Sequence, residues 1–117
     1  AETIEEINKF TQKQKNLIRD DLGRVVIAGH NIFFDIDFMR RLYRLGNSDY
    51  RKYFSHRNLD TSTLLRFFYI TGKIPIEHAS LSAACDYYRI EIKKRHNALH
   101  DALGTAKLLQ KLYILAG

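Results

Sequence analysis

Two short groups of residues in this 117-residue chain combine histidine, asparagine and aspartate in an order that could support hydrolysis. The first is Gly-His-Asn-Ile-Phe-Phe-Asp at residues 29–35, and the second is Arg-His-Asn-Ala-Leu-His-Asp at residues 95–101. Carboxylates are hard oxygen ligands that suit Mg²⁺ or Mn²⁺. A histidine near such an ion could deprotonate a metal-associated water, since its pKa lies near the working pH.

Each group also has a purely structural interpretation. Asn31 could cap a helix, and Asp35 could be a charge in the first helical turn, where the helix dipole favours a carboxylate. His96 could face solvent beside a helix-surface Asp101. Against this, Asp101 is flanked by the apolar residues Leu99, Ala102 and Leu103, which is an unusual setting for a merely solvated charge. Local sequence alone leaves both interpretations open.

The elements around the two groups place them at starts of helices. Residues 24–29 form a short, β-branched apolar run, which favours a buried strand, and a helix is predicted over 33–45. Ligand sites in α/β proteins gather at such strand-to-helix junctions. The last helix is predicted from about residue 97 to 115, so His96 precedes it and Asp101 lies just over one turn inside it.

The rest of the chain is predicted to be mainly helical. Helices are expected over residues 2–21, 48–54, 61–69 and 81–88, with an extended segment near 58–60 and a loop over 71–75. The last helix is expected to bury one apolar face made of Leu99, Leu103, Ala106, Leu109 and Tyr113. The order of elements indicates a helix-rich α/β fold in a single domain spanning residues 1–117, although two short strands are few for a sheet.

Composition narrows the class of protein. A 45% hydrophobic content with a single proline argues for a packed globule. The single cysteine, Cys85, excludes an internal disulfide and suits a reducing compartment, where it is expected to be a small apolar residue on a helix. No apolar run approaches the roughly 18 to 20 residues of a membrane span, and no secretory leader is evident. We therefore expect a cytoplasmic protein.

The chain is basic, with a net charge of +6 and a pI near 9.6, which favours polyanionic partners. One cluster of basic residues follows the first group and comprises Arg40, Arg41, Arg44, Arg51, Lys52 and Arg57. A second cluster, Lys93 to Arg95, leads into His96. These side chains could contact phosphates without reading sequence, or they could be ordinary solvated helix faces. The cluster at 93–95 favours a substrate, because it adjoins His96.

Taken together, the two groups resemble the DEDDh 3'-5' exonucleases of the ribonuclease H-like fold, which include the proofreading epsilon subunit of bacterial DNA polymerase, ribonuclease T and oligoribonuclease. Residues 30–35 match the family's His-Asn-x-x-Phe-Asp block, and His96 with Asp101 match its His-x₄-Asp block. Between them, Asp-Thr at residues 60–61 resembles a segment common in the family, and residues 78–85 resemble the helix before the last block. The blocks occur in family order across residues 24–115.

This resemblance implies a function and a set of roles. Asp35 and Asp101 would ligate a pair of divalent ions, Mg²⁺ or Mn²⁺, and His96 would be the general base. Two ions about 3.5–4 Å apart would stabilise the attacking and leaving oxygens as nucleoside 5'-monophosphates are released from single-stranded DNA or RNA. The resemblance also implies that His30, Asn31 and Phe34 line the site. Arg95 is expected to contact substrate because it adjoins His96. Phe34 is expected to be core rather than a base-stacking residue.

One departure from the family pattern bears on activity. The first family block is an Asp-x-Glu on an early strand, and no Asp-x-Glu occurs in this chain. Asp20 and Asp21 are adjacent and are predicted to end a helix, so they are poor substitutes. Two of four metal carboxylates are therefore expected. The strands could be truncated, supplied by a partner chain or lost from a degenerate copy; because the chain begins at Ala1, we expect a truncated form.

The partners expected from this departure are of two kinds. Missing strands would leave an exposed sheet edge, which invites pairing with another copy, so a homodimer is a hypothesis. The resemblance to the epsilon subunit adds a polymerase partner as a second hypothesis.

Three other interpretations compete with the exonuclease. His100-Asp101 is the dipeptide of the HD phosphohydrolases, but no Asp or Glu follows Asp101 to supply their last ligand. His96 and His100, four residues apart, could bind zinc, but the Glu of a His-Glu-x-x-His protease is absent. A catalytically inactive module that binds nucleic acid or accompanies a polymerase is the main alternative. Metal dependence distinguishes the two, because an inactive module should bind single strands without Mn²⁺.

Overall fold

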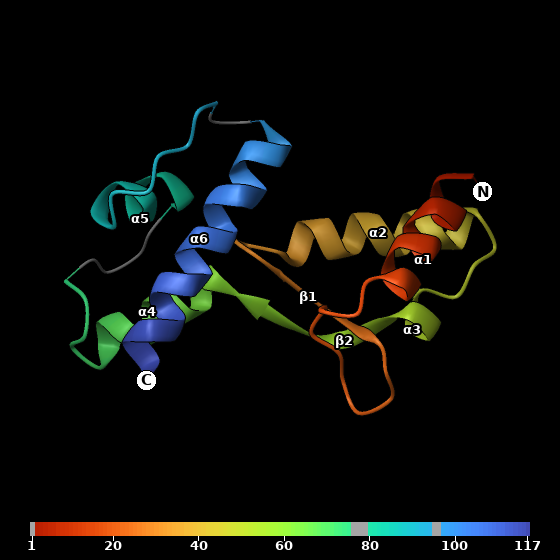
Figure 1. Ribbon diagram of the computed structural model, residues 1–117, viewed down its shortest axis with the longest axis horizontal. Coiled ribbons are helices and arrows are strands. Elements are labelled where there is room, and N and C mark those ends of the chain that lie inside the picture. The colour runs from red at the N-terminus through yellow and green to blue at the C-terminus, as the bar shows by residue number, and fades with distance from the viewer. Residues whose placement is uncertain (1, 76–79, 95–96) are drawn as a thin grey trace. The chain divides into compact units, whose positions relative to one another are not determined.

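A computed structural model of the chain describes residues 2–75, 80–94 and 97–117. Helices dominate, and Figure 1 shows the order of the elements along the chain. The elements are α1 (Glu2–Lys13), β1 (Val25–Gly29), α2 (Phe33–Leu45), α3 (Tyr50–Tyr53), β2 (Phe54–Asp60), α4 (Thr61–Ile70), α5 (Leu81–Tyr87) and α6 (Ala98–Ala116). None of the helices in the described ranges is both long and apolar enough to cross a membrane.

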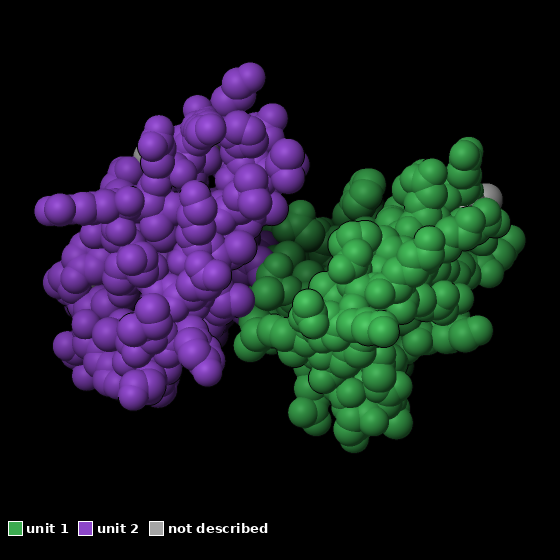
Figure 2. All heavy atoms as spheres, viewed as in Figure 1, with its two compact units in different colours: residues 1–28, 32–59 green, residues 29–31, 60–117 purple. Residues whose placement is uncertain are grey.

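The chain divides into two compact units, which Figure 2 distinguishes by colour. Unit 1 comprises residues 1–28 and 32–59, and unit 2 comprises residues 29–31 and 60–117. The first unit holds α1, α2, α3 and nearly all of the sheet. The second holds α4, α5, α6 and the short turn at residues 29–31.

The two strands pair in parallel as a sheet of order β1-β2. Parallel strands need a crossover connection, and α2 and α3 provide it between β1 and β2. The predicted strand at 24–29 and the predicted helix at 33–45 are confirmed, while β2 begins four residues before the extended segment expected near Asn58. The prediction of a helix-rich α/β fold with few short strands is confirmed.

Unit 1 is organised around the buried ring of Tyr43 on α2. This ring makes edge contacts with Tyr50 of α3 and Phe54 of β2, at centroid distances of 5.6 and 5.9 Å, and its hydroxyl donates to Asn8 Oδ1 of α1 at 2.7 Å. Burial, and then the neighbouring Tyr53 and Tyr50, raise the pKa of Tyr43 to about 12, so the hydroxyl keeps its proton at neutral pH. One side chain therefore ties α1, α3 and β2 to α2.

The helix predicted over residues 2–21 is too long, because α1 ends at Lys13. Beyond it, Arg19 forms an antiparallel bridge with Val25, and Asp20 Oδ1 accepts from the backbone nitrogens of Leu22 and Arg24 at 3.0 and 2.9 Å. Gly23 completes this turn at a φ of 79°. Desolvation acts to raise the pKa of Asp20, but the hydrogen bonds from Arg24, Ser55 and Leu22 outweigh it and lower the pKa to about 2. The ionised carboxylate of Asp20 thus binds backbone N–H groups that would otherwise donate to helical carbonyls.

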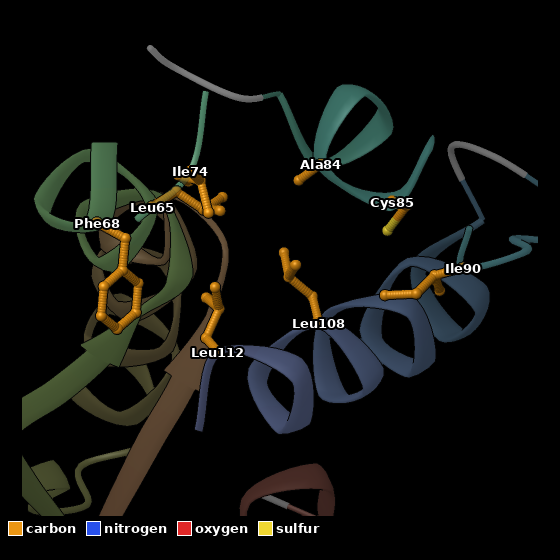
Figure 3. Close-up of a cluster of buried hydrophobic side chains, with 8 residues drawn as sticks. All are labelled: Leu65, Phe68, Ile74, Ala84, Cys85, Ile90, Leu108 and Leu112. Carbon is orange, nitrogen blue, oxygen red and sulfur yellow. The ribbon is translucent and has the colours of Figure 1, made fainter. Parts of the chain in front are cut away.

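The core of unit 2 lies between α4, α5 and α6, whose apolar side chains point toward one another in Figure 3. Its members are Leu65, Phe68, Ile74, Ala84, Cys85, Ile90, Leu108 and Leu112. Ser80 caps α5, as predicted, by accepting from Ala83 N at 3.1 Å. Cys85 is buried on α5, in agreement with its predicted role as a small apolar residue.

The predicted buried face of α6 is wrong. The residues buried on this helix are Gly104, Thr105, Leu108 and Leu112, while Leu99 and Tyr113 of the predicted face are 65% and 81% exposed. The helix is apolar on two faces, so periodicity could not decide which one packs against α4 and α5. Gly104 contributes to the outcome, because a Cβ there would lie 2.9 Å from the Ile92 side chain that packs beside it.

Replacing Leu108 by alanine tests which face of α6 is the core. Leu108 is fully buried, so Leu108→Ala is expected to lower the free energy of unfolding by about 2–5 kcal/mol in urea denaturation. Leu99→Ala, on the exposed face of the same helix, is the matched control and should stay within about 0.5 kcal/mol of the parent. Equal losses in the two variants, or a larger loss in Leu99→Ala, would contradict the packing described here.

Candidate active site

The turn that follows β1 is held in a special backbone conformation. Asn31 has a φ of 54°, in the left-handed region that asparagine tolerates better than most residues. Its backbone N–H donates to Asp60 Oδ1 at 2.9 Å. Asn31 is therefore not the cap of α2; that position is Ile32, which makes no side-chain capping bond.

Thr61, the first residue of α4, lies beneath this turn and is fully buried. Its hydroxyl donates to the Gly29 carbonyl at 3.2 Å and lies 2.8 Å from His30 Nδ1. A hydroxyl has one proton, so donation to Gly29 leaves Thr61 to accept from a protonated Nδ1. This assigns the Nδ1–H tautomer to a neutral His30, in which Nε2 carries the lone pair.

Asp60 connects the same turn to the start of α4. Its Oδ1 accepts from Ser62 N and Ser62 Oγ at 3.0 and 2.7 Å, and thus caps α4 while it holds Asn31. The sequence had marked Asp60 and Thr61 only as part of a familiar segment. The structure shows that they position His30 and Asn31. The Asp-Thr pair at the start of a predicted helix was the only feature of the sequence that pointed to these two residues.

Asp35 and Phe34 lie in the first turn of α2, within unit 1. Asp35 is exposed, and it is the only acidic residue of that first turn. Phe34 is 77% exposed and contacts the neighbouring ring of Phe33 edge-on at 5.7 Å. The expectation that Phe34 is a core residue is therefore wrong for the described part of the chain.

Asp101 lies in the first turn of α6, within unit 2, and is half-buried. Asn97 caps this helix through Oδ1, which accepts from His100 N at 3.2 Å, and the Asn97 carbonyl accepts from Asp101 N at 2.9 Å. Asp101 precedes the buried residues Thr105 and Leu108 by four and seven positions, so it lies on the helix face that packs into unit 2. Asp101 is therefore a partly buried carboxylate at a helix start, where free backbone donors favour a negative charge.

Two predicted site residues, Arg95 and His96, lie outside the described residues. Within the described ranges, no group of three or more His, Cys, Asp or Glu side chains is placed to hold a metal ion. Asp35 and Asp101 have the oxygen donors that Mg²⁺ and Mn²⁺ prefer. The donor chemistry of these two carboxylates thus fits such an ion.

The sequence profile of a protein family described as "Exonuclease" matches residues 2–109. The chain belongs to this exonuclease family. The resemblance to the DEDDh exonucleases is thereby confirmed, and with it the ribonuclease H-like fold class. Membership supports nuclease function in general, and the divalent-metal chemistry that exonucleases of this type use.

Several curated relatives are similar to the chain. DNA polymerase III subunit epsilon of Buchnera aphidicola is 38% identical over 85 residues, covering 72% of this chain and 32% of that protein. Ribonuclease T of Hahella chejuensis is 28% identical over 110 residues, covering 92% of this chain and 46% of that protein. The 3'-5' exonuclease DinG of Staphylococcus epidermidis is 29% identical, covering 84% of this chain and 10% of that protein. The chain thus spans less than half of each relative. No solved structure matches it.

Replacing Thr61 by valine tests the bond network beneath the turn. Thr61→Val keeps the shape of the side chain but leaves the Gly29 carbonyl and His30 Nδ1 without their partner. We expect the free energy of unfolding to fall by about 1–3 kcal/mol, the usual cost of an unsatisfied buried polar group. Thr63→Val, at an exposed position of the same helix, is the control for urea denaturation. A Thr61→Val variant as stable as the control would show that the network is dispensable.

Proposed function

We propose that the chain is a metal-dependent 3'-5' exonuclease domain that hydrolyses the 3' ends of single-stranded nucleic acid. The observation that carries this proposal is the family match over residues 2–109 together with Asp35 and Asp101, each in the first turn of a helix. Helix starts favour carboxylates and leave backbone donors free, so both positions suit a charged site.

In this proposal, Asp35 and Asp101 are ligands for Mg²⁺ or Mn²⁺, and a bound ion would polarise the phosphodiester. His96 takes a proton from the attacking water as the water oxygen bonds to phosphorus. The bond from phosphorus to the 3' oxygen breaks, and the products are a nucleoside 5'-monophosphate and a strand shortened by one residue. Arg95, beside His96 in the sequence, contacts a phosphate of the substrate.

The turn at residues 29–31 and the start of α2 would bind the terminal nucleotide. Thr61 fixes the tautomer and orientation of His30, and Asp60 holds the backbone of Asn31, so both are ordered before a substrate arrives. The exposed ring of Phe34 offers a face on which a base can stack, which is a sequence-tolerant way to hold a single strand. His30, Asn31 and Phe34 form the substrate-binding part of the proposed site.

The metal site is proposed to be incomplete in this chain alone, because the Asp-x-Glu block is absent. Activity of the chain by itself is therefore expected to be weak. A polymerase chain is a proposed partner, supported by the name of the epsilon-subunit relative. The alternative function is an inactive module that binds nucleic acid, and the basic composition of the chain agrees with either.

A homodimer through the free edge of β1 is a further proposal about partners. One edge of β1 pairs with β2. Along its other edge, the described residues pair with β1 only at the bridge between Arg19 and Val25, so the part of this edge beyond Val26 can accept another strand. Sedimentation should show a mass that rises with concentration. A single monomer mass at all concentrations would count against the dimer.

A cleavage assay tests the proposed function. A 5'-labelled single-stranded oligonucleotide incubated with the chain and Mn²⁺ should shorten from its 3' end and release nucleoside 5'-monophosphates. Asp101→Asn and Asp35→Asn should each slow this reaction about a hundredfold or more, since a lost metal ligand removes several kcal/mol of transition-state stabilisation. Asp37→Asn, also exposed on α2, is the matched control and should cleave normally.

Two outcomes would contradict the proposal. Cleavage that persists in Asp101→Asn would place the chemistry elsewhere. Binding of the oligonucleotide that is equally tight with Mn²⁺ and with a chelator, without shortening, would favour the inactive binding module.

A further inference from the structure

Unit 2 contains a cavity of about 290 Å³ that is separate from the carboxylates discussed above. It lies between the segment at residues 91–93 and the exposed side of α6. Its lining residues are Glu91, Ile92, Lys93, His100, Leu103, Gly104 and Lys107.

Specific contacts hold the two walls of this cavity together. The backbone N–H of Lys94 donates to His100 Nδ1 at 3.1 Å, which fixes the 91–93 segment to α6 near its start. Further along, the missing side chain of Gly104 admits Ile92, whose Cδ1 and Cγ1 would both lie 2.9 Å from a Cβ at that position. His100, Gly104 and Lys107 are spaced by four and three residues, so they share one face of the helix.

The chemistry of the lining favours an anion. Two basic residues, Lys93 and Lys107, line the cavity, one from each wall, against the single acidic residue Glu91. Because His100 Nδ1 accepts a hydrogen bond, the proton of the neutral ring is on Nε2, which makes the ring a donor as well. A compact group with several acceptor oxygens satisfies such donors, and phosphate is the common biological example.

We infer that this cavity is a subsite for a backbone phosphate of the nucleic-acid strand, an inference that rests on the proposed function. Lys107 follows Asp101 by six residues on α6, which is about 9 Å along the axis at 1.5 Å per residue. The cavity thus extends along α6 away from Asp101, and we assign it to a phosphate other than the one attacked. Lysines bind phosphate as flexible point charges, so the subsite positions the strand without reading its sequence.

A binding experiment with charge-matched variants tests the subsite. The probe is a fluorescein-labelled single-stranded oligonucleotide, and its affinity is measured by anisotropy between 50 and 200 mM salt in the presence of a chelator. The test variant is Lys93→Ala with Lys107→Ala. The control is Arg66→Ala with Lys111→Ala, which removes the same charge from exposed positions of unit 2 outside the cavity lining.

In the test variant, both the affinity for the oligonucleotide and the dependence of that affinity on salt should decrease. Each neutralised single-strand phosphate contributes about 0.7 to the slope of log affinity against log salt, so loss of the one phosphate held in the cavity lowers the slope by about 0.7. Over this fourfold range of salt, the parent should lose about 2.6-fold more affinity than the test variant. The control should keep a slope close to that of the parent.

Three results would overturn the inference. Equal changes in slope for both variants would mean that only the general charge of the chain matters. An unchanged slope in the test variant would mean that the cavity holds no phosphate. Displacement of the oligonucleotide by millimolar inorganic phosphate or nucleoside 5'-monophosphate, lost in the test variant, would mean that the cavity takes a free phosphate compound. Failure of the proposed function would give a different result. Cleavage would then be absent, while binding of the oligonucleotide measured with the chelator would be unaffected.

Discussion

The arrangement of the candidate site depends on the hydrogen bonds of the Thr61 hydroxyl. It is fully buried, and it bonds both the carbonyl of Gly29 and the ring of His30 at the point where β1 ends. Both strands of a parallel pair end at the same edge of the sheet, so this contact lies where the chain leaves β1 for α2 and leaves β2 for α4. Asp60 repeats the connection through the backbone of Asn31. Thr61 and Asp60 thus both hold the turn at residues 29–31.

Local signals in the sequence were sufficient for many of the elements. β-branched residues between two glycines predicted β1, and the predicted cap Ser80 correctly marked the start of α5. The end of α2 was predicted from Gly46. These features depend on interactions within a few residues, which a sequence displays directly.

Other features depend on partners distant in the sequence, and these could not be predicted. α1 ends early because Asp20 bonds the turn that follows, and Arg19 bonds the carbonyls of Thr11, Gln14 and Gly23. The buried face of α6 is decided by the approach of Ile92 to Gly104, which periodicity does not contain. The pairing of Thr61 with His30 spans 31 positions, and no local rule links the two.

The exonuclease assignment joins two kinds of support. Family membership covers most of the chain, and the helix starts present Asp35 and Asp101 in settings that suit charged ligands. His96 and Arg95 lie outside the described ranges, so the role of His96 rests on the family resemblance and that of Arg95 on its position beside His96 in the sequence. On the other face of α6, the apolar residues Leu99, Leu103 and Tyr113 are exposed.

The central proposal is that Asp35 and Asp101 both ligate divalent metal ions. Paramagnetic broadening by Mn²⁺ in amide-resolved NMR spectra measures this directly, because a bound ion broadens the resonances nearest to it at substoichiometric concentration. The account predicts that amides around Asp35 and around Asp101 broaden together and first, and that Asp101→Asn reduces broadening at both places. Broadening at one of the two alone, or first at unrelated acidic residues such as Glu5 and Asp86, would contradict this proposal.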